Sequence, residues 1–248
     1  MNQTSPTRSS AVLITGATGG IGRAVAQAFA ARGCRLYVGC AHRESLLQQF
    51  AAELSERYEI PCTPLVFDVS DAAAVREAFR PIPSLDGVIH CAGIAHFSLL
   101  QDTNDADWER TIGTDLSGAF HILKNAVPLL LRSSNARILT ISSVWGSHGA
   151  AMESAYSAAK GGLDALTKSL ALELAPSGIP VNAIACGVID TDMNRGHLTA
   201  EELEELQEEI PAGRFGTPGE VAAMSLLLFD APRYLTGQII GLNGGWKL

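Results

Sequence analysis

The chain has 248 residues, 47% of them hydrophobic and 18% charged, with a formal net charge of −8 at pH 7. This composition is typical of a globular protein with a large buried core, and the negative charge argues against binding to nucleic acid or an anionic membrane. The five cysteines are scattered, with no C-x-x-C pair and no His/Cys ligand cluster. We therefore predict reduced thiols, no metal site and no disulfide framework in a cytoplasmic protein.

Residues 1–10 are polar and lack the apolar segment of a signal peptide, so we expect a flexible tail there. Short apolar runs then alternate with helical patterns to the end of the chain. The runs that predict strands are residues 11–15, 35–39, 63–67, 87–90, 137–142, 180–185 and 238–242. The clearest helical patterns cover residues 20–33, 44–58, 71–79 and 153–175.

Strand–helix–strand repetition requires parallel strands joined by right-handed crossovers. The sequence therefore predicts an α/β fold: a doubly wound, seven-stranded parallel sheet with helices on both faces, in one domain over residues 11–248. The acidic run at 200–210 carries apolar residues at Leu203, Leu206 and Ile210. It predicts an amphipathic helix that is either solvated or folded as a lid over a substrate.

The segment TGATGGIG (15–22) joins the first predicted strand to the first predicted helix. Gly16 permits a tight turn, Gly20 allows the backbone to approach a pyrophosphate, and Gly22 allows the helix to pack on the strand. The helix N-terminus also offers free N–H groups to phosphate. A glycine loop alone can be purely structural, but its position in an alternating α/β chain favours dinucleotide binding.

Ser143, Tyr156 and Lys160 form the second motif. Tyr156 and Lys160 are four residues apart in a helical pattern and therefore share one face, although many such pairs are ordinary surface helix. An ammonium about 4 Å from a phenol, at an effective dielectric of about 20, favours the phenolate by roughly 4 kcal/mol, or about three pK units. We therefore expect Tyr156 to exchange protons near neutral pH, with Ser143 holding a substrate oxygen beside it.

With both motifs in view, the chain resembles the short-chain dehydrogenase/reductase family over nearly its full length, and the resemblance implies a Rossmann fold. The family's cofactor motif matches Thr15 to Gly22, and its nicotinamide segment matches CGVIDT (186–191). The residues expected to contact the cofactor are Gly16, Thr18, Gly19, Gly20, Ile21, Gly22, His42, Arg43, Asp68, Val69, Cys91, Ala92, Gly93, Tyr156, Lys160, Gly187, Val188, Ile189 and Thr191.

The resemblance also implies the mechanism. Tyr156 would donate a proton to a carbonyl oxygen as hydride arrives from the nicotinamide, Ser143 would polarise that oxygen, and Lys160 would lower the pKa of Tyr156 and contact the ribose. Asp115 stands where the family has an active-site Asn and would organise the water relay behind the lysine. An ionised Asp cannot donate a hydrogen bond, and its charge would temper the effect of Lys160 on Tyr156.

Three further positions depart from the family pattern. His90 and Cys91 replace two asparagines, which removes amides that usually link neighbouring strands. Cys186 replaces a proline, and we expect it to be tolerated because a buried thiol packs as a small apolar group.

The end of the second predicted strand bears on the choice of cofactor. Relatives that prefer NAD commonly carry an acidic residue there, but this chain has Cys40, followed closely by Arg43. No carboxylate repels a 2′-phosphate, and Arg43 could pair with one. Against this, Gly19 stands where many NADP-users have a basic residue. The sequence favours NADP(H) and leaves NAD(H) open.

The substrate is the least constrained prediction. The chain resembles 3-oxoacyl-[acyl-carrier-protein] reductases, which implies a small or carrier-bound carbonyl substrate and a homotetramer. The segments around Trp145 and Met152 also resemble reductases of a 5-aminopentanone modification on elongation factor P. An acidic carrier would be met by a basic patch at the entrance, for which the candidates are Arg132, Arg137 and Arg195. A non-catalytic dinucleotide-binding sensor is the alternative from another class.

Overall fold

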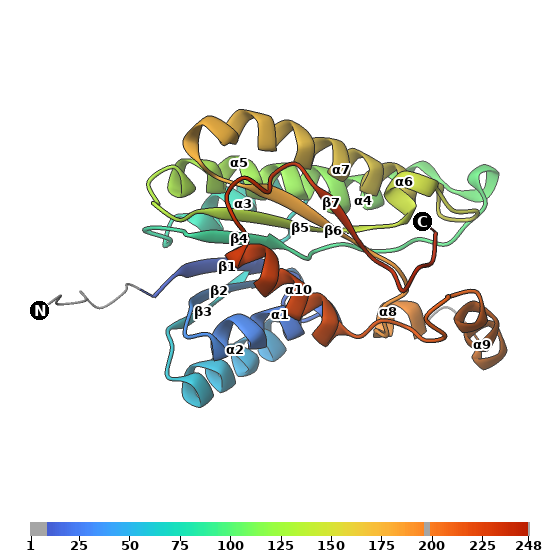
Figure 1. Cartoon of the computed structure of the whole chain (residues 1–248), viewed down its shortest axis with the longest axis horizontal. Coiled ribbons are helices and arrows are strands. Elements are labelled where there is room, and N and C mark those ends of the chain that lie inside the picture. The colour runs from blue at the N-terminus through green and yellow to red at the C-terminus, as the bar shows by residue number, and fades with distance from the viewer. Residues whose placement is uncertain (1–8, 196–198, 248) are drawn as a thin grey trace, which may run out of the picture.

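The computed structural model describes residues 9–195 and 199–247, and its centre is a seven-stranded parallel sheet in the order β3-β2-β1-β4-β5-β6-β7 (Figure 1). The strands are β1 (Ala11–Thr15), β2 (Arg35–Cys40), β3 (Cys62–Val66), β4 (Gly87–His90), β5 (Arg137–Ser143), β6 (Val181–Cys186) and β7 (Ile239–Leu242). All seven predicted strands are present, and their bounds differ from the prediction by at most one residue. The predicted doubly wound α/β fold is confirmed.

Helices cover both faces of the sheet. They are α1 (Gly20–Ala31), α2 (Glu44–Tyr58), α3 (Ala72–Phe79), α4 (Asp105–Ile112), α5 (Gly118–Leu130), α6 (Trp145–His148), α7 (Ser154–Leu174), α8 (Asp192–Arg195), α9 (Ala200–Glu208) and α10 (Pro218–Asp230). Ranges had been predicted for α1, α2, α3, α7 and α9. Among the described residues, no helix is both long and apolar enough to cross a membrane.

Each face of the sheet has its own core. On β1, Val12 and Ile14 point to the face covered by α1, α2 and α10, whereas Ala11 and Leu13 point to the face covered by α3, α5 and α7 (Figure 1). This alternation follows from the two-residue period of a strand. Because both faces are covered, the strand residues are apolar in continuous runs, and this made the strands visible in the sequence.

The order of the strands positions a crevice. β1 pairs with β2 on one side and with β4 on the other, so the chain winds outward in both directions from β1. In open α/β sheets, ligands bind outside the carboxyl ends of the strands where the strand order reverses. In this chain those ends carry the glycine loop after β1 and the segment Cys91–Gly93 after β4.

The predicted tail lies mostly outside the described residues, but its last two residues are joined to the domain. The Ser9 hydroxyl donates to the Gly33 carbonyl at 2.5 Å, and the Arg35 N–H donates to the Ser10 carbonyl at 2.9 Å. Ser9 and Ser10 thus hydrogen-bond to the sheet and its first crossover, and the flexibility of the tail stays a prediction.

Candidate active site

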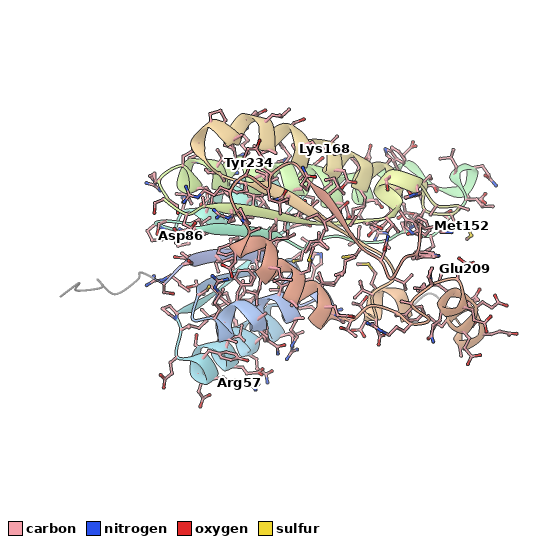
Figure 2. All side chains as sticks on the ribbon, viewed as in Figure 1. Arg57, Asp86, Met152, Lys168, Glu209 and Tyr234 are labelled. Atoms are coloured by element: carbon pink, nitrogen blue, oxygen red, sulfur yellow. The ribbon has the colours of Figure 1, made fainter. Side chains whose placement is uncertain are left out.

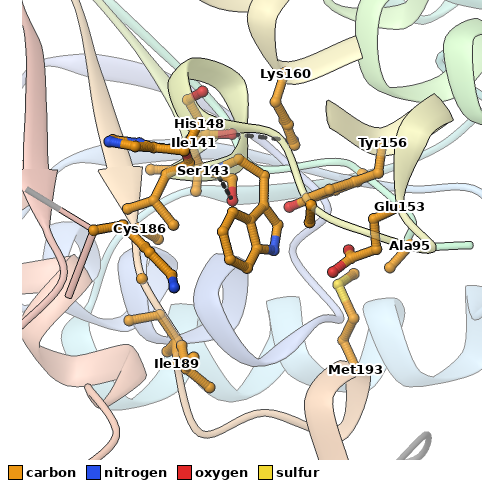
Figure 3. A pocket seen from close by; sticks show the side chains of 18 of the residues that line it. Ala95, Ile141, Ser143, His148, Glu153, Tyr156, Lys160, Cys186, Ile189 and Met193 are labelled. Atoms are coloured by element: carbon orange, nitrogen blue, oxygen red, sulfur yellow. Dashed lines mark hydrogen bonds between the residues drawn. The ribbon is translucent and has the colours of Figure 1, made fainter. Parts of the chain in front are cut away.

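Ser143, Tyr156 and Lys160 meet at the carboxyl end of the sheet. Ser143 is the last residue of β5, and the other two lie one turn apart near the start of α7. The Lys160 ammonium is 5.3 Å from the centroid of the Tyr156 ring, and it donates to the Ile141 carbonyl at 3.3 Å. All three side chains line one cavity of about 630 Å³ (Figure 3). The structure thus brings together the residues that the sequence grouped.

Asp115 lies behind Lys160. Its Oδ2 is 3.1 Å from the Lys160 Nζ, its Oδ1 accepts a hydrogen bond from the Ile94 N–H at 2.8 Å, and the carboxylate is fully buried. The residue sits in a π-helical turn, η2 (Gly113–Ser117), which joins α4 to α5. Such turns often occur at functional sites because the extra residue redirects a side chain. Gly93 packs so closely here that a Cβ on it would lie 2.7 Å from Oδ2 of Asp115.

The electrostatics differ from the expectation based on spacing. Burial raises the pKa of Tyr156 to about 12, because desolvation of the phenolate outweighs the attraction of Lys160. Asp115 and Glu153 also raise this pKa, whereas the Ser143 hydroxyl lowers it. The expected near-neutral pKa is therefore wrong for this structure, since the spacing argument omitted the desolvation of the phenol and the anion behind the lysine.

The pKa of Lys160 is set by two opposing effects. Burial lowers it, but the attraction of Asp115 and Tyr156 outweighs burial and raises the pKa above that of an ordinary lysine. Burial also raises the pKa of the Asp115 carboxyl, against the influence of Lys160 and the Ile94 N–H. At neutral pH we assign a cationic Lys160 paired with an anionic Asp115, because the separation of 3.1 Å makes each charge the main partner of the other.

The glycine loop has the close packing of a cradle. Gly16 adopts a φ of +66°, and a Cβ on it would lie 2.8 Å from the backbone N of Ala92. A Cβ on Gly22 would lie 2.2 Å from the Gly16 carbonyl oxygen. The start of α1 at Gly22 therefore packs directly against the turn at Gly16. A Cβ on Gly20 would lie 2.9 Å from a methyl carbon of Thr191, so this position also has no room for a side chain.

The residues expected to contact a cofactor surround two adjoining cavities. Gly16, Thr18, Gly19, Gly20, Gly22, His42, Arg43, Asp68, Val69 and Ala92 line a cavity of about 740 Å³. Gly187, Val188 and Ile189 line the cavity of Tyr156 and Lys160, and Ile21, Cys91, Gly93 and Thr191 line both. The Asp68 carboxylate accepts hydrogen bonds from the N–H and the hydroxyl of Ser70, each at 2.8 Å. Among the described residues, no cluster of His, Cys, Asp and Glu could hold a metal ion.

His90 and Cys186, two residues that depart from the family pattern, end β4 and β6 and fit the fold. His90 is fully buried, and its Nδ1 lies 3.0 Å from the Thr15 hydroxyl. We had expected the missing asparagine to remove a link between neighbouring strands, but the imidazole itself links β4 to β1. Burial lowers the pKa of His90 to about 3, which keeps the ring neutral. Cys186 packs in the apolar core as expected, and burial raises the pKa of its thiol to about 12.

Several residues of the first cavity were missed by sequence reasoning. Glu153 lines the wall beside Tyr156, and Trp246 packs edge-on against Trp145 with their ring centroids 4.8 Å apart. Leu206 of α9 lines the same cavity, so this helix lies over the site and is not merely solvated. The position of Glu153, three residues before Tyr156, could have indicated a residue of the site. It was missed because an acidic residue at the start of a helix is commonly explained by its interaction with the helix N-terminus.

Two of the three arginines predicted for a basic patch lie away from the cavity. Arg137 begins β5, and its N–H donates to the Asp86 carbonyl at 3.0 Å, while Arg132 hydrogen-bonds to the Pro83 carbonyl. Figure 2 shows Asp86 at the opposite end of the sheet from Met152 and Glu209. Arg132 and Arg137 therefore lie at the amino ends of the strands, away from the site. The side chain of Arg195 lies outside the described residues.

Proteins of similar sequence match this chain over nearly its whole length. A family model described as enoyl-(acyl carrier protein) reductase matches residues 16–247. The chain is 36% identical over 236 residues to the uncharacterized oxidoreductase YmfI of Bacillus subtilis, covering 94% of this chain and 97% of that protein. It is also 36% identical over 238 residues to the 3-oxoacyl-[acyl-carrier-protein] reductase FabG of Escherichia coli, covering 94% of this chain and 95% of that protein.

Solved structures agree with these relatives. The 3-oxoacyl-[acyl-carrier protein] reductase of Brucella melitensis superposes with a TM-score of 0.91 at 29% identity, covering 100% of this chain and 98% of the other. A putative gluconate dehydrogenase of Agrobacterium tumefaciens has a TM-score of 0.89 at 30% identity, with 95% of each chain covered. With Ser143, Tyr156 and Lys160 at one cavity and the glycine loop beside it, the chain belongs to the short-chain dehydrogenase/reductase family of oxidoreductases.

Proposed function

We propose that this protein reduces a ketone to an alcohol with a nicotinamide dinucleotide as reductant. The observation that carries the proposal is the continuity of the two cavities. The cavity of Ser143, Tyr156 and Lys160 shares Ile21, Cys91, Gly93 and Thr191 with the cavity of the glycine loop. A nucleotide held by the loop could therefore reach the phenol.

The residues of the second cavity fit such a nucleotide. Gly16 and Gly22 leave the loop no room for side chains, and the free N–H groups at the start of α1 suit a pyrophosphate. By position along the cavities, the loop Gly16–Gly22 would hold the pyrophosphate, Asp68 and Val69 the adenine, and Gly187–Thr191 the nicotinamide. When bound, the nicotinamide supplies the hydride for the carbonyl carbon.

The remaining chemistry belongs to the side chains of the first cavity. The Ser143 hydroxyl donates a hydrogen bond to the carbonyl oxygen and polarises it. As the carbon is reduced, the O–H bond of Tyr156 breaks and its proton passes to the same oxygen. Lys160 stabilises the resulting phenolate, and Asp115 holds the ammonium in place at 3.1 Å. A phenol with a raised pKa is protonated at neutral pH and is ready to donate.

Arg43 supports NADPH as the preferred nucleotide. It lines the nucleotide cavity three residues after Cys40, the last residue of β2, and no salt bridge involves it among the described residues. Its guanidinium is thus available to pair with a 2′-phosphate. Cys40 at the strand end cannot bind the ribose hydroxyls as a carboxylate would.

Two substrates are supported by different observations. Similarity to FabG of E. coli supports a 3-oxoacyl group on a carrier protein. Reduction of the 5-aminopentanone modification of elongation factor P is the second candidate, and it is favoured by the carboxylate of Glu153 in the wall of the cavity. A non-catalytic sensor is disfavoured because Ser143, Tyr156 and Lys160 are all present at the cavity.

A homotetramer in the cytoplasm accords with this assignment. Trp108 of α4, Phe120 of α5 and Leu172 of α7 are large apolar side chains that remain exposed. Exposed apolar patches commonly mark protein interfaces. Light scattering after gel filtration tests the assembly, and a monomer would refute it.

A ketone panel assayed with both nicotinamides tests the function. We expect oxidation of NADPH with at least one ketone, and we expect Tyr156→Phe to lose about 100-fold or more of this activity because the proton donor is removed. Calorimetric titration with the nucleotide should show similar binding to both proteins. Turnover retained by Tyr156→Phe would refute the assignment of the proton donor.

A further inference from the structure

The cavity of Tyr156 contains one acid whose charge is not balanced. Three carboxylates line it, and two of them are paired with ammonium groups: Asp115 with Lys160 at 3.1 Å, and Glu209 with Lys247 at 3.9 Å. Glu153 is the third, and among the described residues it has no cation within salt-bridge distance. Its polar partner from within the cavity is the neutral side chain of Trp145.

The side chain of Glu153 does not cap α7, the helix that begins after it. It is the N-cap residue of α7, yet its side chain makes no capping hydrogen bond. Elsewhere in the chain, Asp71, Thr199 and Thr217 cap helices through their side chains. Figure 3 shows the carboxylate of Glu153 directed into the cavity on the same side as the hydroxyl of Tyr156. The ordinary structural role of this residue type is therefore absent.

The surroundings make an unpaired carboxylate costly. Burial raises the pKa of Glu153 to about 7, and the hydrogen bond from Trp145 lowers it only in part. A buried charge is stabilised by a partner of opposite sign. A 3-oxoacyl chain offers none near its ketone, so beside a neutral substrate Glu153 would take up a proton, whereas an ammonium group would stabilise its carboxylate.

The aromatic walls of the cavity accept an alkylammonium group. The Lys247 ammonium lies 5.1 Å from the ring centroid of Trp246 and 6.0 Å from that of Trp145. Indole rings attract cations through their electron-rich faces. A lysine of the chain itself thus already occupies the type of environment that a cationic substrate would meet.

We propose that Glu153 determines specificity by binding an alkylammonium group of the substrate, so that the site selects ketones that carry a positively charged amine. Glu153 precedes Tyr156 by three residues, which places the amine-binding and proton-donating groups on adjacent parts of one wall. The proposal rests on the proposed reductase function, and it distinguishes amino ketones from neutral acyl chains as a substrate class.

A matched pair of ketones tests the proposal. In 5-(dimethylamino)pentan-2-one the tertiary amine is protonated at neutral pH, and 6-methylheptan-2-one has the same shape with carbon in place of nitrogen. Homologues with longer spacers extend the comparison. The full-length protein with saturating NADPH should show a kcat/KM at least about tenfold higher for the amine. Glu153→Gln should reduce kcat/KM for the amine by about 10- to 100-fold, as expected for a hydrogen bond to a charged group. The ratio of kcat/KM for the amine to kcat/KM for the neutral ketone should fall by a similar factor.

The control variant is Glu204→Gln, which makes the same change of net charge on the exposed surface of α9. It should leave the preference for the amine unchanged. Equal activity of wild type on both ketones, or an equal loss for both in Glu153→Gln, would overturn the proposal while leaving the reductase function intact.

Binding without turnover separates the two hypotheses. Calorimetric titration of the corresponding amino alcohol into the full-length protein with oxidised nucleotide should show binding that Glu153→Gln weakens at least about tenfold. If the amine binds in this way but no ketone is reduced, the proposed function fails and the role of Glu153 stands. If Glu153→Gln binds the amine as wild type does, the role of Glu153 is refuted.

Discussion

The Lys160 ammonium and the Asp115 carboxylate lie 3.1 Å apart in the interior, one behind the other as seen from the cavity of Tyr156. This ion pair has two effects on the phenol. Lys160 lowers the pKa of Tyr156, and Asp115 raises it. The pair therefore weakens the activation of Tyr156 that a lysine paired with a neutral amide would provide.

Asp115→Asn should lower the pKa of Tyr156 by about one unit, which corresponds to about 1.4 kcal/mol of lost repulsion. Alcohol oxidation requires the ionised phenol, so its rate rises as the pH approaches the pKa of Tyr156. The rising limb of kcat/KM for oxidation should move to lower pH in the variant. Rate profiles from pH 6 to pH 10 measure the shift, and superimposable profiles would contradict the coupling.

Gly16→Ala should destabilise the protein and weaken nucleotide binding. The residue has a φ of +66°, and its Cβ would lie 2.8 Å from the backbone of Ala92. Gly33→Ala is the matched control, because Gly33 has a φ of +81° but nothing within 4 Å of its Cβ. We expect Gly33→Ala to lose about 1–2 kcal/mol of stability from the backbone conformation alone.

Urea unfolding should show a larger loss of stability in Gly16→Ala than in Gly33→Ala. Nucleotide titration should show weaker binding only in Gly16→Ala. Equal effects of the two variants would mean that backbone conformation, and not close packing of the loop, explains the requirement for glycine at position 16.

Arg43→Ala should raise KM for NADPH by about 10- to 100-fold, the effect of losing a hydrogen bond to a charged phosphate. KM for NADH should change little, because NADH lacks the 2′-phosphate. Arg23→Ala is the control, since Arg23 is a partly exposed arginine that pairs with Glu53 at 3.7 Å. Parallel changes for both nucleotides in Arg43→Ala would exclude Arg43 as the phosphate-binding residue.

His90 should make the protein sensitive to acid. Burial lowers its pKa from 6.5 to about 3, so the unfolded chain binds a proton that the folded chain excludes. Stability is therefore lost as the pH falls from about 6.5 toward 3. His90→Asn removes this titration and should show a flatter decline of Tm over the same range. Parallel curves for the two proteins would show that His90 is not the source.

The pH dependence of stability due to Glu153 should be opposite to that of His90. Burial raises its pKa from 4.5 to about 7, so the folded chain holds a proton that the unfolded chain releases. Wild type should lose stability, relative to Glu153→Gln, as the pH rises from about 4.5 through 7. The difference in Tm between the two proteins should grow over that range, at about 2–4 °C per kcal/mol for a chain of this size. A constant difference would argue against the burial of this carboxyl.

The strands and the two motifs could be predicted because their signals are local. Runs such as AVLIT carry the apolar character of a buried parallel strand, and the glycine loop follows one of them directly. The range of α10 was not predicted, because its exposed positions also carry apolar residues such as Ala223 and Leu227, so the helix lacks a clear polar face. The π-helical turn at Asp115 also had no sequence signal, since it depends on how α4 and α5 pack.

The sequence by itself determined the fold class, the glycine loop and the pairing of Tyr156 with Lys160, because these follow from local patterns and spacing along the chain. Ser143 lies in another element, and the family resemblance added it to the group. Only the tertiary structure decided that burial raises the pKa of Tyr156 to about 12, and that Glu153 faces the cavity with no cation within salt-bridge distance among the residues that the structure describes. Desolvation and pairing depend on every neighbour that folding brings to a group. Those neighbours come from distant parts of the chain, so spacing along the sequence does not reveal them.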